Sequence, residues 1–186
     1  MKKAVGNFLL QMIPVALGVY LGFLVSDWSE NNSKRAQRDQ LKASMLSEMQ
    51  VNLQQLEKIV DYHRVLKDSS QYYANPSNPI RKPYFFRGTR ISKLSNSAYM
   101  TGIQTGAINE LPLETIQKIN QVYTRQNDYN DYGTLILSGL INKKFSEKKE
   151  DMRDIAQFLA ITMVDVVAME QELILKYQNL QIDLEK

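Results

Sequence analysis

The chain contains no cysteine and only one histidine, His63, among its 186 residues. Without cysteine it cannot form disulfide bonds, thiolate metal sites or a lipid anchor on a thiol, although this leaves the redox compartment open. A single histidine also excludes the zinc sites built from Cys and His, and the paired Glu-x-x-His motifs of di-iron helix bundles. We therefore expect no metal and no cofactor.

Glycine and proline are also scarce, with eight and five residues, and the net charge is only +3. No glycine-rich loop suited to phosphate is present, and no nucleophile elbow surrounds any serine. A Ser-His-Asp arrangement would have to use His63 with Asp61 beside it, and we expect His63 to be a surface or helix-packing residue instead. The sequence thus predicts a protein that is not an enzyme, and the small net charge does not favour a nucleic-acid partner.

Charged residues are absent from one long apolar stretch, residues 4–26, AVGNFLLQMIPVALGVYLGFLVS. As a helix it would be about 34 Å long, enough to cross a hydrocarbon core of about 30 Å. A secretory signal peptide is the main alternative, but no convincing cleavage site follows the run. A buried helix of a soluble protein is the second, although such helices rarely run so far without a charge. We predict a transmembrane helix over 4–26 after a basic N-terminus at 1–3.

The polar and small residues of this stretch fall on one side of the helix. At about 100° per residue, Asn7, Gln11, Gly18 and Gly22 lie within roughly 80° of one another, together with Pro14. Small residues allow close approach of helix backbones in a bilayer, and amides can hydrogen-bond between helices. This face is therefore a predicted intramembrane packing surface, and its neighbour is either a second copy of the chain or another subunit.

Residues beside the stretch bear on its place in the membrane. Trp28 follows it directly, where aromatic side chains anchor helices at the membrane interface. The short basic start, Lys2 and Lys3, favours an N-terminus inside the cell, whereas a plain count of Lys and Arg after the span would put the body in the cytoplasm. We expect a single-pass protein of the inner (cytoplasmic) membrane with an extracytoplasmic body.

The remaining residues, 27–186, predict one all-α soluble domain, a bundle-like body on a long helix that continues from the span. We expect a long helix at 33–69, a loop at 70–94, helices at 95–106 and 112–145 with Gly133 as a candidate kink, and a long helix at 148–184. The first and last of these helices carry heptad-like apolar stripes, typical of an antiparallel pair. The stripes alone do not decide whether they pack within one chain or between chains.

The loop carries basic residues interleaved with aromatic ones, which predicts contact with a partner or with lipid headgroups. The alternative is that the aromatic rings pin the loop onto the bundle while the charges stay in water. The residues concerned are Arg81, Lys82, Tyr84, Phe85, Phe86 and Arg87.

Several short motifs resemble a known family. They are Ser26-Asp27-Trp28-Ser29-Glu30-Asn31 after the span, Leu46, Glu48 and Asn52 on the long helix, Ser97-Ala98-Tyr99, Gly106-Ala107, and Tyr123 with Gln126. Across residues 12 to 130, the chain resembles an uncharacterised family of short single-pass bacterial membrane proteins with a helical soluble body. The resemblance implies a membrane-anchored helical body and no reaction. Glu48 and Asn52, one helical turn apart, are candidates for a side-chain pair or a hydrogen-bond node.

The function expected from these observations is that of a non-catalytic accessory or scaffolding subunit, which docks its span and body onto a larger membrane protein complex. Its partners would be other membrane subunits and the lipid bilayer. One alternative is a homo-oligomer packed through the two heptad stripes. Another is a sensor that binds a ligand between the helices of its body and signals through the span.

Overall fold

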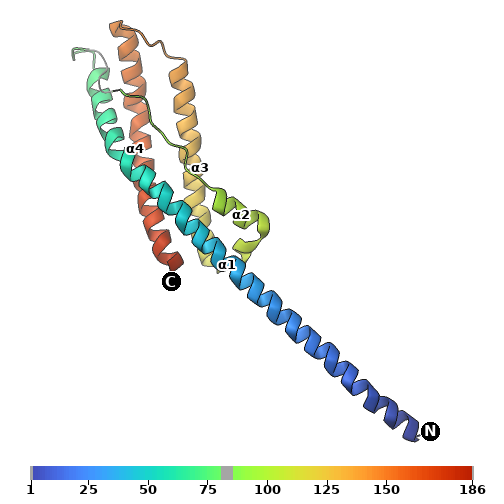
Figure 1. Cartoon of the computed structure of the whole chain (residues 1–186). Coiled ribbons are helices and arrows are strands. Elements are labelled where there is room, and N and C mark those ends of the chain that lie inside the picture. Colours follow the sequence, from blue (N-terminus) through green and yellow to red (C-terminus); the bar gives the residue numbers. More distant parts are fainter. Residues whose placement is uncertain (1, 81–85, 186) are drawn as a thin grey trace.

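The computed structural model describes the backbone of residues 2–80 and 86–185, with side chains from Met12 onward. These residues form four α-helices and a short 3₁₀ helix, and none of them lies in a β-strand, so the expected all-α class is confirmed. In chain order the elements are α1 (Lys2–Ala74), α2 (Ser97–Thr105), η1 (Ala107–Glu110), α3 (Leu113–Ile141) and α4 (Lys149–Glu185) (Figure 1).

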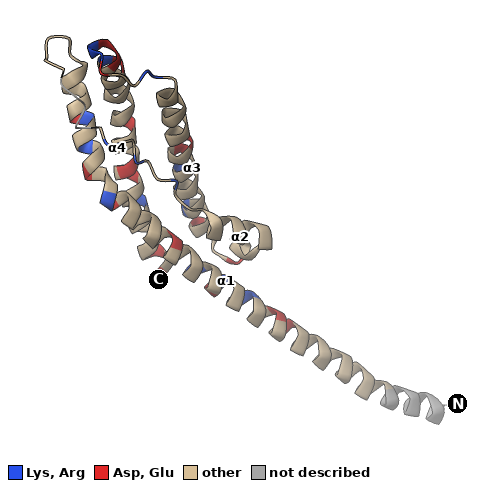
Figure 2. Cartoon of the chain, turned by 45° about the horizontal axis from the view of Figure 1, so that its top comes forward, with Lys and Arg blue, Asp and Glu red and all other residues tan. Residues whose placement is uncertain are grey.

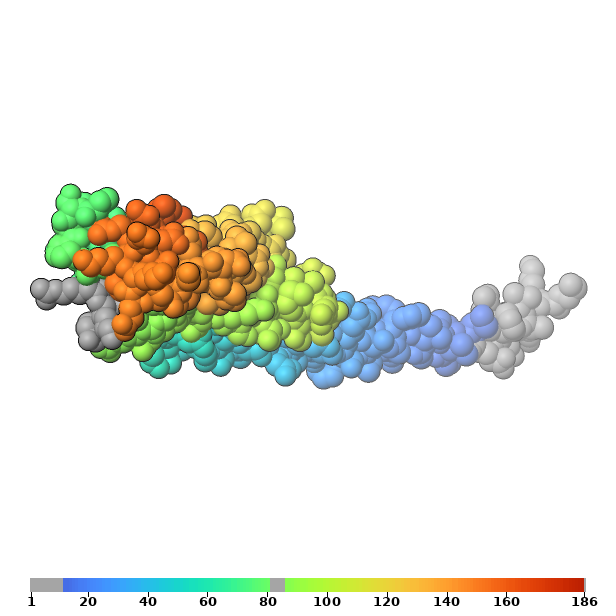
Figure 3. Space-filling view, turned by 90° about the horizontal axis from the view of Figure 1, so that it is seen from above, coloured from blue at the N-terminus to red at the C-terminus, as the bar shows by residue number. Residues whose placement is uncertain are grey.

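Helix α1 is unbroken over 73 residues, with Pro14 inside it, and extends five residues beyond the predicted end at 69. At 1.5 Å per residue it is about 110 Å long. Its N-terminal part projects alone from the body (Figures 1 and 3), and residues 12–40 are exposed except for Arg38, which is half-buried. Within the described chain, this is the helix that is long and apolar enough to cross a membrane.

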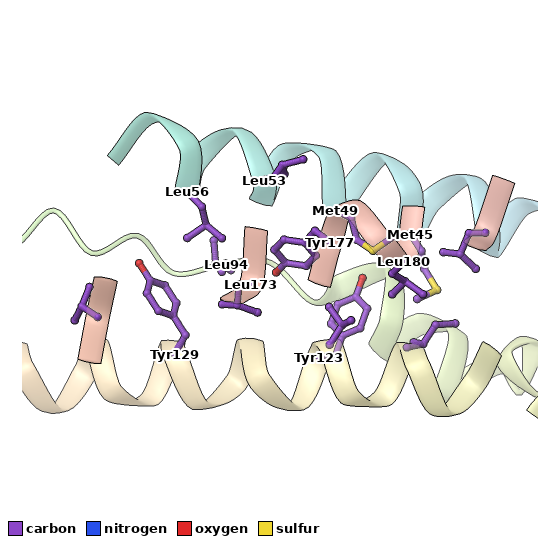
Figure 4. Close-up of a cluster of buried hydrophobic side chains, with 14 of the residues drawn as sticks. Met45, Met49, Leu53, Leu56, Leu94, Tyr123, Tyr129, Leu173, Tyr177 and Leu180 are labelled. Atoms are coloured by element: carbon purple, nitrogen blue, oxygen red, sulfur yellow. The ribbon is translucent and has the colours of Figure 1, made fainter. Parts of the chain in front are cut away.

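The body is built around α4, which packs along α1 on one side and α3 on the other. Both predicted apolar stripes are buried here within a single chain, which settles how they pack. Met45, Met49 and Leu56 of α1 meet the α4 core residues Leu173, Tyr177 and Leu180, while Tyr123 and Tyr129 enter from α3 (Figure 4). Among the side chains of α1 described from Met12 onward, the first buried one is Leu41, about 15 residues after the apolar stretch.

An extended segment, residues 86–96, runs between α1 and α3 and fills the gap that these two helices leave (Figure 1). We call it the strap. Helix α3 passes through Gly133 without ending, so the predicted continuation of this helix is confirmed, whereas the kink stays a prediction. A Cβ atom at Gly133 would lie 2.7 Å from Cγ2 of Ile91 in the strap. Gly133 is therefore needed for close approach of the strap to α3.

Helix α2 and η1 close the end of the body from which the free part of α1 emerges (Figure 1). Gly106 ends α2 in the left-handed conformation, with φ 74°, as its sequence position predicts. Gly102 lies against Leu41, where a Cβ atom would be 2.8 Å from the leucine methyl groups. This contact fixes α2 beside the outer side of α1.

Candidate functional site

Gly18 and Gly22 lie on the exposed part of α1. A Cβ atom added to either glycine would meet no other atom within 4 Å. The side chains of Asn7 and Gln11 are outside the described residues. The predicted intramembrane face therefore has no partner among the described residues of its own chain at the two glycines, and its packing role remains a prediction.

The segment after the apolar stretch is exposed and charged. Trp28 is 68% exposed, two residues beyond Ser26, as an interfacial anchor would be. Glu30 and Lys34 form an ion pair one turn further on, at 2.7 Å. Their hydrogen bond raises the pKa of Lys34 and lowers the pKa of Glu30, so both groups keep their charges. We call residues 27–40 the stem.

Of the predicted partner or lipid loop, only the last two residues are described. Arg81, Lys82, Tyr84 and Phe85 lie outside the described residues. Phe86 is half-buried and stacks on Phe145, with ring centroids 6.4 Å apart. Arg87 is exposed, and its backbone N–H donates to the Tyr62 hydroxyl at 3.0 Å. Phe86 thus pins the strap to the body, in line with the alternative interpretation of this loop.

His63 is fully buried, so the helix-packing part of its expected role is confirmed and a surface position is wrong. Its Nε2 is 2.6 Å from the backbone oxygen of Thr89 in the strap. Because a carbonyl oxygen only accepts, Nε2 must carry a hydrogen. Its Nδ1 is 2.7 Å from Oε1 of Glu170 on α4. A second hydrogen must therefore lie between Nδ1 and Oε1.

Tyr129 of α3 completes this cluster by donating its hydroxyl to the same Glu170 oxygen at 2.9 Å. Burial and the nearby Glu170 carboxyl raise the pKa of Tyr129, which keeps the phenol protonated as a donor. The second Glu170 oxygen, Oε2, is buried without a hydrogen-bond partner. Because His63 and Glu170 are 0% exposed, a substrate could not reach them in this fold. The cluster ties α1, α3, α4 and the strap together.

A second polar cluster binds the strap at Leu94 and Ser95. Asn52 donates to the backbone oxygen of Ser95 at 2.8 Å and accepts from its N–H at 3.0 Å. Gln126 of α3 donates to the same oxygen at 2.8 Å. Tyr177 of α4 donates to Gln126 at 2.6 Å. Asn130 pairs in the same two-sided way with the N–H and C=O of Leu94, at 2.9 and 3.0 Å.

Side-chain amides thus take the place of a neighbouring β-strand and satisfy the backbone of the extended strap. The sequence indicated only some of the residues that bind the strap. The positions of Asn52 and Gln126 belong to the motifs noted above, but nothing in the sequence indicated that Asn130 binds the strap or that Glu170 binds His63.

Glu48 is a hydrogen-bond node for α2. It accepts from the backbone N–H of Ala98 in the first turn of α2, from the Ser95 hydroxyl and from the Tyr123 hydroxyl, each at 2.9 Å. A carboxylate at a helix N-terminus is stabilised by the helix dipole. The ring of Tyr123 stacks on Tyr99 of α2 at 4.4 Å. Glu48 and Asn52 therefore bind consecutive parts of the chain rather than one another.

The outer side of α4 carries a row of exposed apolar residues that no sequence argument had singled out. Ile161 is 73% exposed, Leu175 61%, Ile182 55% and Val164 43%. Ala168 is exposed between them. Their spacings of 3, 4, 7 and 7 follow one heptad seam. We call these five residues the α4 ridge.

Charges beside the ridge are engaged within the chain. Glu172 binds Arg125 at 2.7 Å, and Asp165 accepts from Tyr132 at 3.0 Å. Burial and the Asp165 contact raise the pKa of Tyr132 to about 12. These interactions turn the two acidic side chains toward α3 and away from the ridge, whose own five residues carry no charge.

An open groove lies between the outer side of α1 and α2, with a volume of about 730 Å³. Its lining contains no charged residue: Gln37, Gln40, Leu41, Ser44, Ser97, Ala98, Thr101, Thr105 and Ala107. A second hollow of about 620 Å³ continues it along α1 toward Val51 and includes Glu48.

The chain matches no model of a known protein family, no curated protein and no solved structure. The function is therefore inferred from the features of this molecule: a long apolar helix, a body whose polar clusters are buried, and the α4 ridge, which no described residue of the chain covers.

Proposed function

We propose that this protein is a non-catalytic, membrane-anchored docking subunit that attaches to a larger membrane protein complex. The span holds it in the bilayer, the stem sets the distance of the body from the membrane surface, and the α4 ridge binds a partner subunit. No step of this role requires a metal, a cofactor or a reaction.

The apolar part of α1 supports the membrane anchor. Residues 12–26 are exposed on all sides and carry no charge (Figure 2), an arrangement that water disfavours and a bilayer accepts. The stem that follows is about 21 Å long as a helix. A body held at that distance can contact the extramembrane part of a neighbouring subunit while its span remains in the bilayer.

The observation that carries the docking role is the α4 ridge. Helix α4 is the central helix of the body, yet its outer side exposes four large aliphatic side chains on one heptad seam. Exposed Gln171 and Gln178 interrupt the row between Ala168, Leu175 and Ile182. Apolar residues grouped on one exposed side and rimmed by polar ones mark protein–protein interaction sites. Burying these side chains would contribute about 1–3 kcal/mol each, which suits a partner helix with its own apolar stripe.

The closed polar clusters support a role without catalysis. His63, Glu170 and Tyr129 are the residues closest to a catalytic arrangement in the described chain, but all three are buried and bonded to one another through Glu170, and His63 also binds the strap. Their contacts instead make the body rigid, which is what a subunit that presents a fixed surface requires.

The docking role can be tested by photo-crosslinking the full-length protein in its native membranes. A photoreactive amino acid at Leu175 should give an adduct with one foreign subunit. The matched control is Gln117, an exposed residue on α3 that is not part of the ridge. Leu175→Glu should abolish co-purification of that subunit, whereas Gln117→Glu should not. Equal adducts from Leu175 and Gln117 would refute docking through the ridge.

We further propose that the protein resides in the inner membrane with an extracytoplasmic body. The absence of natural cysteine makes this testable with one variant. Gln117→Cys should react with a membrane-impermeant maleimide in intact spheroplasts. Reaction only after the membrane is broken would place the body in the cytoplasm and leave the docking role unaffected.

A further inference from the structure

A second unpartnered face runs along α1 from the apolar stretch into the body. Gly18, Ser29, Gln40 and Val51 follow one another at intervals of eleven residues, and all four are exposed. Eleven residues make slightly more than three turns of an α-helix, so these positions stay on one side over a length of about 50 Å. Gly22 begins a parallel row four residues later, with Ser33 and Ser44. We call these seven positions the outer face of α1.

This face excludes charge even where the helix is highly charged. Residues 27–42 contain seven charged side chains: Asp27, Glu30, Lys34, Arg35, Arg38, Asp39 and Lys42. At about 100° per residue, every one of them lies roughly 80° or more from the centre of the outer face. The stem residues other than Arg38 are exposed in this fold, so packing within the chain gives no reason to keep charges off one side.

The far end of the face enters the groove beside α2. Gln40 and Ser44 line that groove together with Ser97, Ala98 and Thr101 of α2. Its volume of about 730 Å³ is open to solvent and its lining is uncharged. The core of the body packs on the opposite side of α1, through residues such as Met45, Met49 and Leu56. The face is therefore accessible along its whole described length.

We propose that the outer face of α1 packs against the same face of a second copy of this chain, as a parallel pair. The proposal uses the membrane anchoring argued above, but not the α4 ridge. Two copies inserted in one bilayer have the same orientation and depth, so a two-fold axis along the membrane normal brings each position close to its own counterpart. The two α1 helices would then enter one another's grooves beside α2.

Charge identifies the occupant as a second copy. In a symmetric parallel pair, any charge on the shared face meets the same charge of the other copy, which is repulsive. Apart from Glu48, which is half-buried and bonded to Ala98, Ser95 and Tyr123, the face is free of charge over about nine turns of helix and so avoids this repulsion. A foreign partner would not impose this exclusion, because it could carry opposite charges at the matching positions. The small side chains allow close approach, and the eleven-residue spacing favours a right-handed crossing of the two helices.

Cysteine crosslinking in native membranes tests the pair, because the chain has no cysteine of its own. Full-length Ser29→Cys, Ser33→Cys and Ser44→Cys should each form a disulfide-linked dimer on oxidation, at twice the 21.5 kDa chain mass. Asn31→Cys is the control, since residue 31 is exposed on the opposite side of the same stem. Because its thiol points away from the second copy, it should give at least roughly tenfold less dimer. A tenfold difference corresponds to about 1.4 kcal/mol.

Charge exchange separates a second copy from any other occupant. Ser33→Glu and Ser33→Lys, each combined with Ser29→Cys, should reduce dimer formation because each variant meets its own charge. Co-expression of the two should restore a mixed dimer, because the new carboxylate of one chain then faces the new ammonium group of the other. Loss without restoration would refute direct self-packing at this level.

Each outcome distinguishes this inference from the docking role. A crosslink of Ser33→Cys to a foreign protein, or equal dimer yields from Ser33→Cys and Asn31→Cys, overturns the α1 pair. Neither result affects the prediction that Leu175 of the α4 ridge crosslinks to a foreign subunit. Conversely, a dimer through α1 without any adduct at Leu175 supports the pair and refutes docking through the α4 ridge.

Discussion

Glu170 offers a sharp test of how the strap is held. Its Oε1 lies 2.7 Å from His63 Nδ1 and accepts from the Tyr129 hydroxyl at 2.9 Å, inside a core that excludes water. Replacing Glu170 by leucine removes the partner of both groups at once and leaves both buried. Replacing it by glutamine keeps the shape and places an amide –NH2 where Oε1 was. This group donates to Nδ1 of a neutral His63, while Nε2 still donates to Thr89, and it donates to the Tyr129 hydroxyl instead of accepting from it.

The two substitutions should therefore change the free energy of unfolding by different amounts. A buried group left without a partner costs about 1–3 kcal/mol, and breaking a buried pair from one side costs about 3–5 kcal/mol. We therefore expect Glu170→Leu to lower the free energy of unfolding by about 3–5 kcal/mol. Glu170→Gln should lower it by only about 1 kcal/mol, because the amide hydrogen bond to His63 survives.

The measurement is urea unfolding of the full-length protein in detergent, followed by far-UV circular dichroism. A double-mutant cycle with His63→Leu should show coupling of about 1 kcal/mol or more, as expected for neighbours in one network, which couple by about 0.5–3 kcal/mol. If Glu170→Leu and Glu170→Gln were equally destabilising, the hydrogen bond to His63 would not be the source of the effect. Additive effects of the two leucine substitutions would refute the pairing itself.

Four further predictions rest on single features. Gly133→Ala should destabilise the body by about 1–3 kcal/mol through overpacking against Ile91, and Ile91→Ala should recover part of the loss in urea unfolding. Burial holds the pKa of Tyr132 at about 12 in the fold, so this phenol stays protonated above the unfolded value of about 10; the free energy of unfolding should therefore fall as pH rises from about 10 toward 12, with tyrosinate absorbance appearing late. Trp28, the only tryptophan, should be quenched by bromine-labelled lipids in proteoliposomes, and unquenched emission would contradict an interfacial position. Inserting two residues after Arg35 should turn the outer face of the span by about 200° relative to the body and abolish simultaneous crosslinking at residues 22 and 44, whereas inserting eleven should preserve it.

The parts of the fold that follow from local periodicity were predictable. The apolar stripes of α1 and α4 repeat every three to four residues, and this spacing predicted two long helices. The stripes left open whether these helices pack within one chain or between chains. Gly106 was recognisable as a helix end because only glycine adopts its left-handed conformation easily. These features depend on residues that are close in the sequence.

The strap and its contacts were not predictable, because they depend on residues far apart in the sequence. The sequence predicted a loop up to residue 94. It did not predict that side-chain amides of α1 and α3 hold the last part of this loop in place, because the loop's own residues carry no such signal. His63 had no visible partner in the sequence, since Glu170 follows 107 residues later. Gly133 was considered only as a candidate kink, because a lone glycine in a helix gives no indication of which segment approaches it.

The α4 ridge was missed for a different reason. One apolar stripe per helix is enough to build a bundle core, and the buried stripe of α4 already satisfies that expectation. Helix α4 carries a second apolar row on its outer side, and only the fold distinguishes an outward Ile161 from an inward Leu159. A helix with apolar residues on two sides is typical of a helix that is covered on both. The ridge therefore becomes a functional candidate because α1 and α3 leave it bare.

The continuity of α1 links the two proposed contacts. Because the helix is unbroken from the apolar stretch to Ala74, a contact that fixes the rotation of the span also fixes the rotation of the body. His63 and Asn52 lock the strap and the bundle onto this same helix, so α4 has a set direction relative to the outer face of α1. In a parallel pair the two α4 ridges would face away from the shared axis, since the core side of α1 lies opposite its outer face. A dimer through α1 would therefore leave both ridges free, and each could bind one partner subunit.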